Sequence, residues 1–157
     1  MSYDGWTFAF KDYTDVNLTT HLDTPQFNDM CKIIDPIYYY DRLARLVKLV
    51  VVSSDDEFMQ MDWTNIWYNN IKGETHLLIA PNSEHSCATA LPEILNSASA
   101  LIMSMAYQHT EADRPDFTYT YNNVTGELVV TIKEGFTPTK VLLRYAQTLQ
   151  DVRRDFR

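Results

Sequence analysis

An apolar run that stops abruptly at acidic residues is the feature of this sequence that most constrains its fold. Residues 46–52 read Leu-Val-Lys-Leu-Val-Val-Val, and they are followed by two serines and three acids at 53–57. A strand with so few polar positions is typical of a sheet that is covered on both faces. Residues that follow the C-terminal end of such a strand lie where open α/β sheets hold their ligands. We therefore predict a strand over residues 46–53 that delivers carboxylates to this edge.

A second unit of the same kind follows after about twenty residues. Residues 75–80 form another apolar strand, and Pro81-Asn82-Ser83-Glu84-His85 comes after it. Between the two strands, Asp62 can cap a helix whose apolar residues recur with the 3.6-residue period, and Gly73 can end it: Trp63, Ile66, Trp67 and Ile71. A helix of this length can join parallel neighbours, so we predict that the two strands are adjacent and parallel.

One strand ends in acids and the next ends in a histidine, which makes His85 the candidate general base. A carboxylate beside a histidine can hold it in one tautomer and stabilise its protonated form. Of Asp55 and Asp56, one must point inward and the other to solvent, and the pattern alone does not choose. Two alternatives stay open: a solvated acidic turn with Asp62 as a helix cap, and a calcium site, although the spaced oxygen ligands of a calcium loop are not present. The sequence predicts no cofactor and no metal.

The nucleophile of a catalytic triad has no candidate in this sequence. Chain order acid then histidine matches the second half of an α/β-hydrolase triad, in which the serine comes first in a G-x-S-x-G turn. No such motif occurs in residues 1–157. Cys87 lies only two residues after His85, too close for the two side chains to form a nucleophile–base pair across a site. We therefore predict an acid and a base without their nucleophile.

The flanking segments predict helices first and short strands later. Thr24-Pro25 begins a helix that ends near Ile34, before Asp35-Pro36, and a long amphipathic helix covers residues 90–108. Residues 117–121 and 127–133 alternate around a turn at 122–126, which predicts a β-hairpin, with a third strand near 141–143. We predict an α/β protein with two parts: residues 1–113, a partial α/β-hydrolase-like domain, and residues 114–157, the start of a β-sandwich.

Composition and short motifs limit the partners and the compartment. The formal net charge of −8 argues against a nucleic-acid surface, and no stretch approaches a membrane span of about 20 apolar residues. No signal peptide is visible at the start of the sequence. We expect that Cys31 and Cys87 are not both exposed, and whether they pair stays open. Asn17 and Asn123 each begin an N-glycosylation sequon, which has a use only in the secretory pathway.

Several segments together resemble the PhoPQ-activated pathogenicity-related family. They occur in order over nearly the whole chain: residues 2–13, 35–43, 48–58, 73–74, 81–86 and 154–157. The resemblance implies an α/β-hydrolase-like domain followed by a small β-rich domain. It also implies that Asp56, in the segment Asp56-Glu57-Phe58, is the acid and that His85 is the histidine. Asp55 stands where the family usually has glycine.

The resemblance further implies that this chain is the C-terminal part of a longer protein. The family's serine lies in a Gly-x-Ser-Lys-type segment well before residue 1, so the expected partner is a missing N-terminal half. We expect hydrolase ancestry of esterase or serine peptidase type, with the chain inactive alone. Because the family is typically secreted and includes a repressor of cell proliferation, the alternative is a secreted signalling protein. In that case the fold is a non-catalytic scaffold and the partner is a cell-surface receptor.

Overall fold

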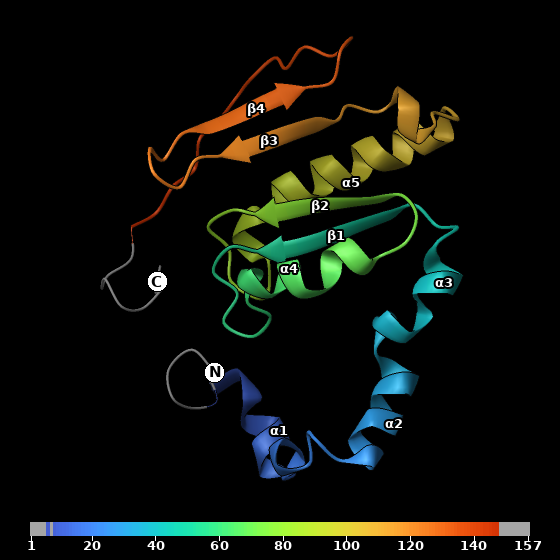
Figure 1. Cartoon of the computed structure of the whole chain (residues 1–157), viewed down its shortest axis with the longest axis vertical. Helices are drawn as coiled ribbons and strands as arrows, with labels where there is room; N and C mark the ends of the chain where they lie inside the picture. Colours follow the sequence, from blue (N-terminus) through green and yellow to red (C-terminus); the bar gives the residue numbers. More distant parts are fainter. Residues whose placement is uncertain (1–5, 7, 148–157) are drawn as a thin grey trace. The chain divides into compact units, whose positions relative to one another are not determined.

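The computed structural model describes residue 6 and residues 8–147, and it has an α/β fold (Figure 1). One compact unit extends along the chain to Ala98, and a second unit comprises Ser99–Tyr145. The predicted domain boundary at residues 113–114 stays a prediction. The elements are α1 (Lys11–Asp15), α2 (Pro25–Ile34), α3 (Tyr40–Leu43), β1 (Lys48–Ser53), α4 (Thr64–Trp67), β2 (Thr75–Ala80), α5 (Leu91–Ala106), β3 (Phe117–Tyr121) and β4 (Leu128–Ile132).

Strands β1 and β2 lie side by side and run in the same direction (Figure 1). Their register pairs Lys48 with Thr75 at one end and Ser53 with Ala80 at the other. The predicted adjacent, parallel pair is therefore confirmed. Because Ser53 and Ala80 are in register, the segments that follow the two strands leave the sheet at the same edge. This edge positions the candidate site.

Burial in this two-stranded sheet is concentrated at its C-terminal end. Ser53 is 1% exposed and Ala80 is fully buried, whereas Leu77 and Ile79 are 36% and 45% exposed. Leu77 and Ile79 are two residues apart and project from the same face of β2. The prediction of a sheet covered on both faces is thus wrong for the described residues. The composition of a strand indicates that it needs a cover, but it does not indicate which segment provides one.

The connection between the strands differs from the single capped helix that we predicted. It consists of a 3-10 turn at Met61–Trp63, the short helix α4 and a 3-10 turn at Tyr68–Asn70. Asp62 lies inside the first turn, whose N-cap is Gln60, so the predicted cap is wrong. The Thr64 hydroxyl donates to the Met61 carbonyl (2.7 Å). The three pieces follow one another directly, so residues 61–70 are helical without forming one regular α-helix.

Gly73 is left-handed as predicted, but it does not end the helical segment, which stops at Asn70 with Ile71 extended. The φ of Gly73 is +77°, the left-handed region that favours glycine. A Cβ atom at this position would lie 1.9 Å from the carbonyl oxygen of Ala44. The backbone before β2 therefore approaches the backbone before β1 too closely for any side chain. Glycine is required here on both grounds.

The predicted helix over residues 25–34 is present as α2. The Thr24 hydroxyl caps it by accepting a hydrogen bond from the Phe27 N–H (3.2 Å). Asp35 is extended, as expected for a residue before proline. Cys31 on this helix is half-buried, and Cys87 in the loop after β2 is half-buried too. The prediction that they are not both exposed is confirmed, and both are free thiols.

The second unit contains the predicted β-hairpin. Strands β3 and β4 are antiparallel, with Phe117 opposite Ile132 and Tyr121 opposite Leu128 (Figure 1). In the turn, the Asn122 carboxamide oxygen accepts from the backbone N–H groups of Val124 (2.9 Å) and Thr125 (3.2 Å). All residues of both strands are exposed. The hairpin is thus held by its ladder and its turn.

The predicted third strand near residues 141–143 is wrong. Within the described part of this unit, only β3 and β4 pair. Val141, Leu142 and Leu143 are 80%, 58% and 79% exposed and have no regular structure. Strand propensity depends on a neighbouring edge and on packing, and these residues have neither here. Across the described chain, no helix has the length and apolar character that crossing a bilayer requires.

Candidate acid–base site

Asp56 is held in the turn that follows β1. Its carboxylate Oδ1 accepts hydrogen bonds from the backbone N–H groups of Phe58 (2.8 Å) and Met59 (2.7 Å). The Asp56 side chain is only 7% exposed. An aspartate commonly bonds to the backbone two residues later in a turn, so the local sequence accounts for this geometry. The result is a fixed carboxylate whose other oxygen is available to a neighbour.

The segment that carries His85 is tied to the segment that carries Asp56. The Ser54 N–H donates to the Ala80 carbonyl (2.9 Å), and the Asp55 N–H donates to the Ser83 carbonyl (3.0 Å). In return, the Asn82 N–H donates to the Ser54 hydroxyl (2.9 Å). These bonds extend the pairing of β1 and β2 beyond the strands. They bring His85 close to the Asp56 carboxylate, and one of them uses the backbone N–H of Asp55.

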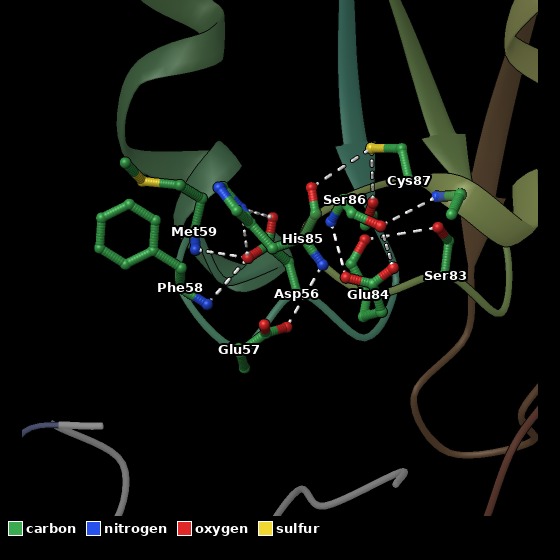
Figure 2. A network of polar contacts seen from close by, with 11 residues as sticks. Asp56, Glu57, Phe58, Met59, Ser83, Glu84, His85, Ser86 and Cys87 are labelled. Carbon is green, nitrogen blue, oxygen red and sulfur yellow. Dashed lines mark hydrogen bonds and ion pairs between the residues drawn. The ribbon is translucent and has the colours of Figure 1, made fainter. Parts of the chain in front are cut away.

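Figure 2 shows the Asp56 carboxylate and the His85 imidazole directed toward one another. The His85 Nδ1 atom lies 3.1 Å from both Asp56 carboxylate oxygens. A carboxylate accepts, so Nδ1 carries the proton in this contact, and Nε2 of the neutral ring is left as a proton acceptor. The His85 side chain is 48% exposed. The predicted contact between these residues is present, and their catalytic role stays a prediction.

An aromatic cluster, defined here as Trp6, Phe10, Tyr13 and Phe58, adjoins the histidine. The Phe58 ring meets the His85 ring edge-on, with centroids 5.1 Å apart and planes at 90°. Phe58 in turn contacts Phe10 (5.0 Å) and Tyr13 (5.9 Å), and Phe10 contacts Trp6 (5.2 Å). The sequence patterns alone do not assign the first three aromatics to the site. Their spacing of four and then three residues is helical, and it was a signal for a shared face.

Two further polar pairs support the histidine loop, and the sequence patterns predict neither of them. The Ser53 Oγ and Cys87 Sγ atoms lie 3.1 Å apart. Glu84 accepts from the Ser86 hydroxyl and from the Ser86 N–H (2.7 Å), on the opposite side of the loop from Phe58 (Figure 2). These two hydrogen bonds lower the pKa of the Glu84 carboxyl below its usual value, and the bond from the Ser86 hydroxyl contributes most. Neither the pair that is 34 residues apart in the sequence nor the pair that is two residues apart leaves a periodic trace in a sequence.

The two predicted glycosylation sites, Asn17 and Asn123, are on the surface of their own units. Asn17 is exposed, with φ at +58°, and Asn123 is exposed in the hairpin turn. Both sequons are therefore accessible in the folded chain, and glycosylation stays a prediction. No group of at least three histidine, cysteine, aspartate or glutamate side chains suited to a metal ion is found among residues 6 and 8–147.

The chain belongs to the PhoPQ-activated pathogenicity-related protein family, whose family model matches residues 1–157. This confirms the family predicted from the sequence segments. Among curated proteins, the chain is similar to autocrine proliferation repressor protein A of Dictyostelium discoideum, with 35% identity over 163 residues. The match covers 99% of this chain and 32% of that relative, so the chain spans about a third of the relative's length. No solved structure matches the chain.

Proposed function

We propose that this chain supplies the acid and the base of a hydrolase-type catalytic site. In this proposal Asp56 orients the histidine and His85 is the general base of an esterase or serine peptidase reaction. The contact of Nδ1 with both Asp56 oxygens at 3.1 Å carries the proposal. A buried carboxylate beside a half-exposed imidazole is the arrangement that such a base requires, because one nitrogen is fixed and the other can meet a substrate.

The proposed chemistry follows from the two ring nitrogens. With Nδ1–H held by Asp56, the Nε2 lone pair takes the proton of a nucleophilic hydroxyl as its oxygen attacks an acyl carbon. His85 then returns this proton to the leaving group. Asp56 stays ionised throughout and stabilises the imidazolium that forms between these steps. Each proton that leaves the nucleophile is therefore delivered to the product.

The nucleophile of this reaction would come from outside residues 1–157. These residues contain no G-x-S-x-G turn, and the similar Dictyostelium protein is about three times as long as the match. An α/β-hydrolase-like fold is part of the proposal, because an acid follows β1 and a histidine follows the adjacent parallel strand β2. The exposed apolar side chains of Leu77 and Ile79 also suit a sheet that continues or is covered elsewhere in a longer protein.

A second candidate function is a secreted signalling protein in which this fold is a non-catalytic scaffold. The name of the similar relative, a proliferation repressor, favours it. In this reading the chain contacts a cell-surface receptor, and the accessible Asn17 and Asn123 carry glycans. The fold alone does not choose between the two functions.

The test expresses the chain from its full reading frame and measures ester hydrolysis and cell proliferation in parallel. His85→Ala and Asp56→Asn should each lower kcat for hydrolysis by about 10³-fold or more. His21→Ala is the matched control, because it removes an imidazole from a different part of the chain. Full hydrolysis by His85→Ala would overturn the catalytic proposal. Repression of proliferation by His85→Ala at the wild-type level, without any hydrolysis by the parent, would establish the scaffold.

A further inference from the structure

We infer that Asp56, Glu57 and Phe58 act as one unit that positions His85, with Glu57 and Phe58 as positioning residues beside the acid. The inference rests on the proposed function, because it explains how the base is aimed. Each of these consecutive residues contacts a different part of the same histidine. The Asp56 carboxylate contacts the ring nitrogen Nδ1, and the Glu57 carboxylate accepts a hydrogen bond from the His85 backbone N–H. The Phe58 ring packs edge-on against the imidazole (Figure 2).

Glu57 fixes the point from which the imidazole extends. Its carboxylate Oε2 accepts a hydrogen bond from the backbone N–H of His85 (3.3 Å). A carboxylate on Nδ1 restrains only the end of the side chain, and the ring can still shift if the loop moves. With the backbone also held by the residue next to Asp56, the acid and the histidine keep a constant separation. This second restraint is what aims Nε2 in one direction.

Phe58 restrains the ring itself. Its edge-on contact with the imidazole opposes rotation about χ2, and it covers part of a side chain that is otherwise half-exposed. Phe58 is held in place by Phe10 and Tyr13. Its backbone N–H also donates to Asp56 Oδ1 (2.8 Å), so Phe58 contacts both members of the acid–base pair. A substitution at Phe58 should therefore change the positions of both Asp56 and His85.

The test is an NMR measurement of the His85 tautomer in the full chain. Two-bond proton–nitrogen correlations distinguish a protonated from an unprotonated ring nitrogen, so they report whether Nδ1 or Nε2 carries the proton. The variants are Glu57→Ala, Glu57→Gln, which keeps an acceptor oxygen, and Phe58→Leu. Glu57→Leu also removes the acceptor oxygens, but it keeps a side chain of similar length. Glu84→Ala is the matched control, because its carboxylate lies in the same loop but bonds to Ser86.

We expect the wild-type chain to hold the Nδ1–H tautomer. Glu57→Ala, Glu57→Leu and Phe58→Leu should each shift the tautomer ratio toward Nε2–H by roughly threefold, within what one lost hydrogen bond or ring contact can produce. Glu57→Gln should restore the wild-type ratio, and Glu84→Ala should leave it unchanged. A merely structural role would lower stability without this selective change in the ring.

Asp56→Asn separates the inference from the proposed function on which it rests. If Asp56→Asn reverses the tautomer while the Glu57 and Phe58 variants keep the wild-type ratio, the inference is overturned and the acid–base pair stands. If Asp56→Asn itself leaves the ratio unchanged, the pair fails, and with it the proposed function. An equal shift in Glu57→Ala and Glu84→Ala would show a general charge effect and would also overturn the role of Glu57.

Discussion

The hydroxyl of Ser53 and the thiol of Cys87 lie 3.1 Å apart, although 34 residues separate them in the sequence. Ser53 is the last residue of β1 and is 1% exposed, while Cys87 follows the histidine by two residues. The pair therefore joins the end of the sheet to the far side of the histidine loop. Its contribution to stability can be isolated because both side chains are small.

We predict that Ser53→Ala and Cys87→Ala each lower the free energy of unfolding by about 1 kcal/mol, the usual value of one hydrogen bond. The double variant should lose less than the sum, with a coupling energy of at least about 0.5 kcal/mol. Cys87→Ser keeps a donor and should stay near wild type. Urea unfolding measures all four variants, and strictly additive single losses would contradict the pair.

Gly73→Ala should be far more damaging than the same substitution at Gly126. Both glycines have positive φ (+77° and +74°), and a left-handed alanine alone costs about 1–2 kcal/mol. At Gly73 the new Cβ would also lie 1.9 Å from the Ala44 carbonyl oxygen, whereas at Gly126 nothing lies within 4 Å. We expect a loss of more than about 3 kcal/mol at Gly73 by urea unfolding. Equal losses at the two sites would show that the close approach does not matter.

Ser86→Ala should raise the pKa of Glu84 toward its ordinary value, because the Ser86 hydroxyl is the main cause of its lowering. A carboxyl with a lowered folded pKa stabilises the fold above its unfolded pKa, and this stability is lost as pH falls through the folded pKa. The destabilisation by Ser86→Ala should therefore be present at pH 7 and disappear in acid. An NMR titration of the Glu84 carboxyl in the wild type and in Ser86→Ala measures the shift. An unchanged midpoint would refute it.

The isolated 157-residue chain should hydrolyse a p-nitrophenyl ester no faster than its own His85→Ala variant. The reason is that the proposed base has no nucleophile within this sequence, and a base alone adds little to a reaction that needs acyl transfer. Initial rates at equal protein concentration provide the measurement. Clear hydrolysis that His85→Ala abolishes would mean that a nucleophile within residues 1–157 had been overlooked.

The part of the fold that sequence periodicity controls was predictable. Strands β1 and β2, the helix α2 with its Thr24 cap and the hairpin each depend on local patterns that a sequence displays directly. The contact between Asp56 and His85 was predictable for the same reason, because parallel neighbours end at one edge. The choice of Asp56 over Asp55 followed from the family resemblance. The structure gives its physical basis, since the Asp56 carboxylate is held by the N–H groups of Phe58 and Met59 and lies against His85 Nδ1.

The rest depends on contacts that periodicity does not encode. The division of residues 61–70 into 3-10 and α pieces has no signal in the periodicity, and residues 141–143 pair with no strand among the described residues. The open face at Leu77 and Ile79 depends on which segments cover it. The roles of Glu57 and Phe58 come from a turn whose direction only coordinates show.

The register of Ser53 with Ala80 has a consequence for how relatives of this chain can vary in length. Three residues lead from Ser53 to Asp56 and five lead from Ala80 to His85, and both stretches are cross-linked by backbone hydrogen bonds. An inserted or deleted residue in either stretch would replace the carboxylate or the imidazole with its neighbour. The irregular connection over residues 59–72 has no such constraint. Insertions and deletions should therefore accumulate in that connection and be absent from residues 53–58 and 80–85.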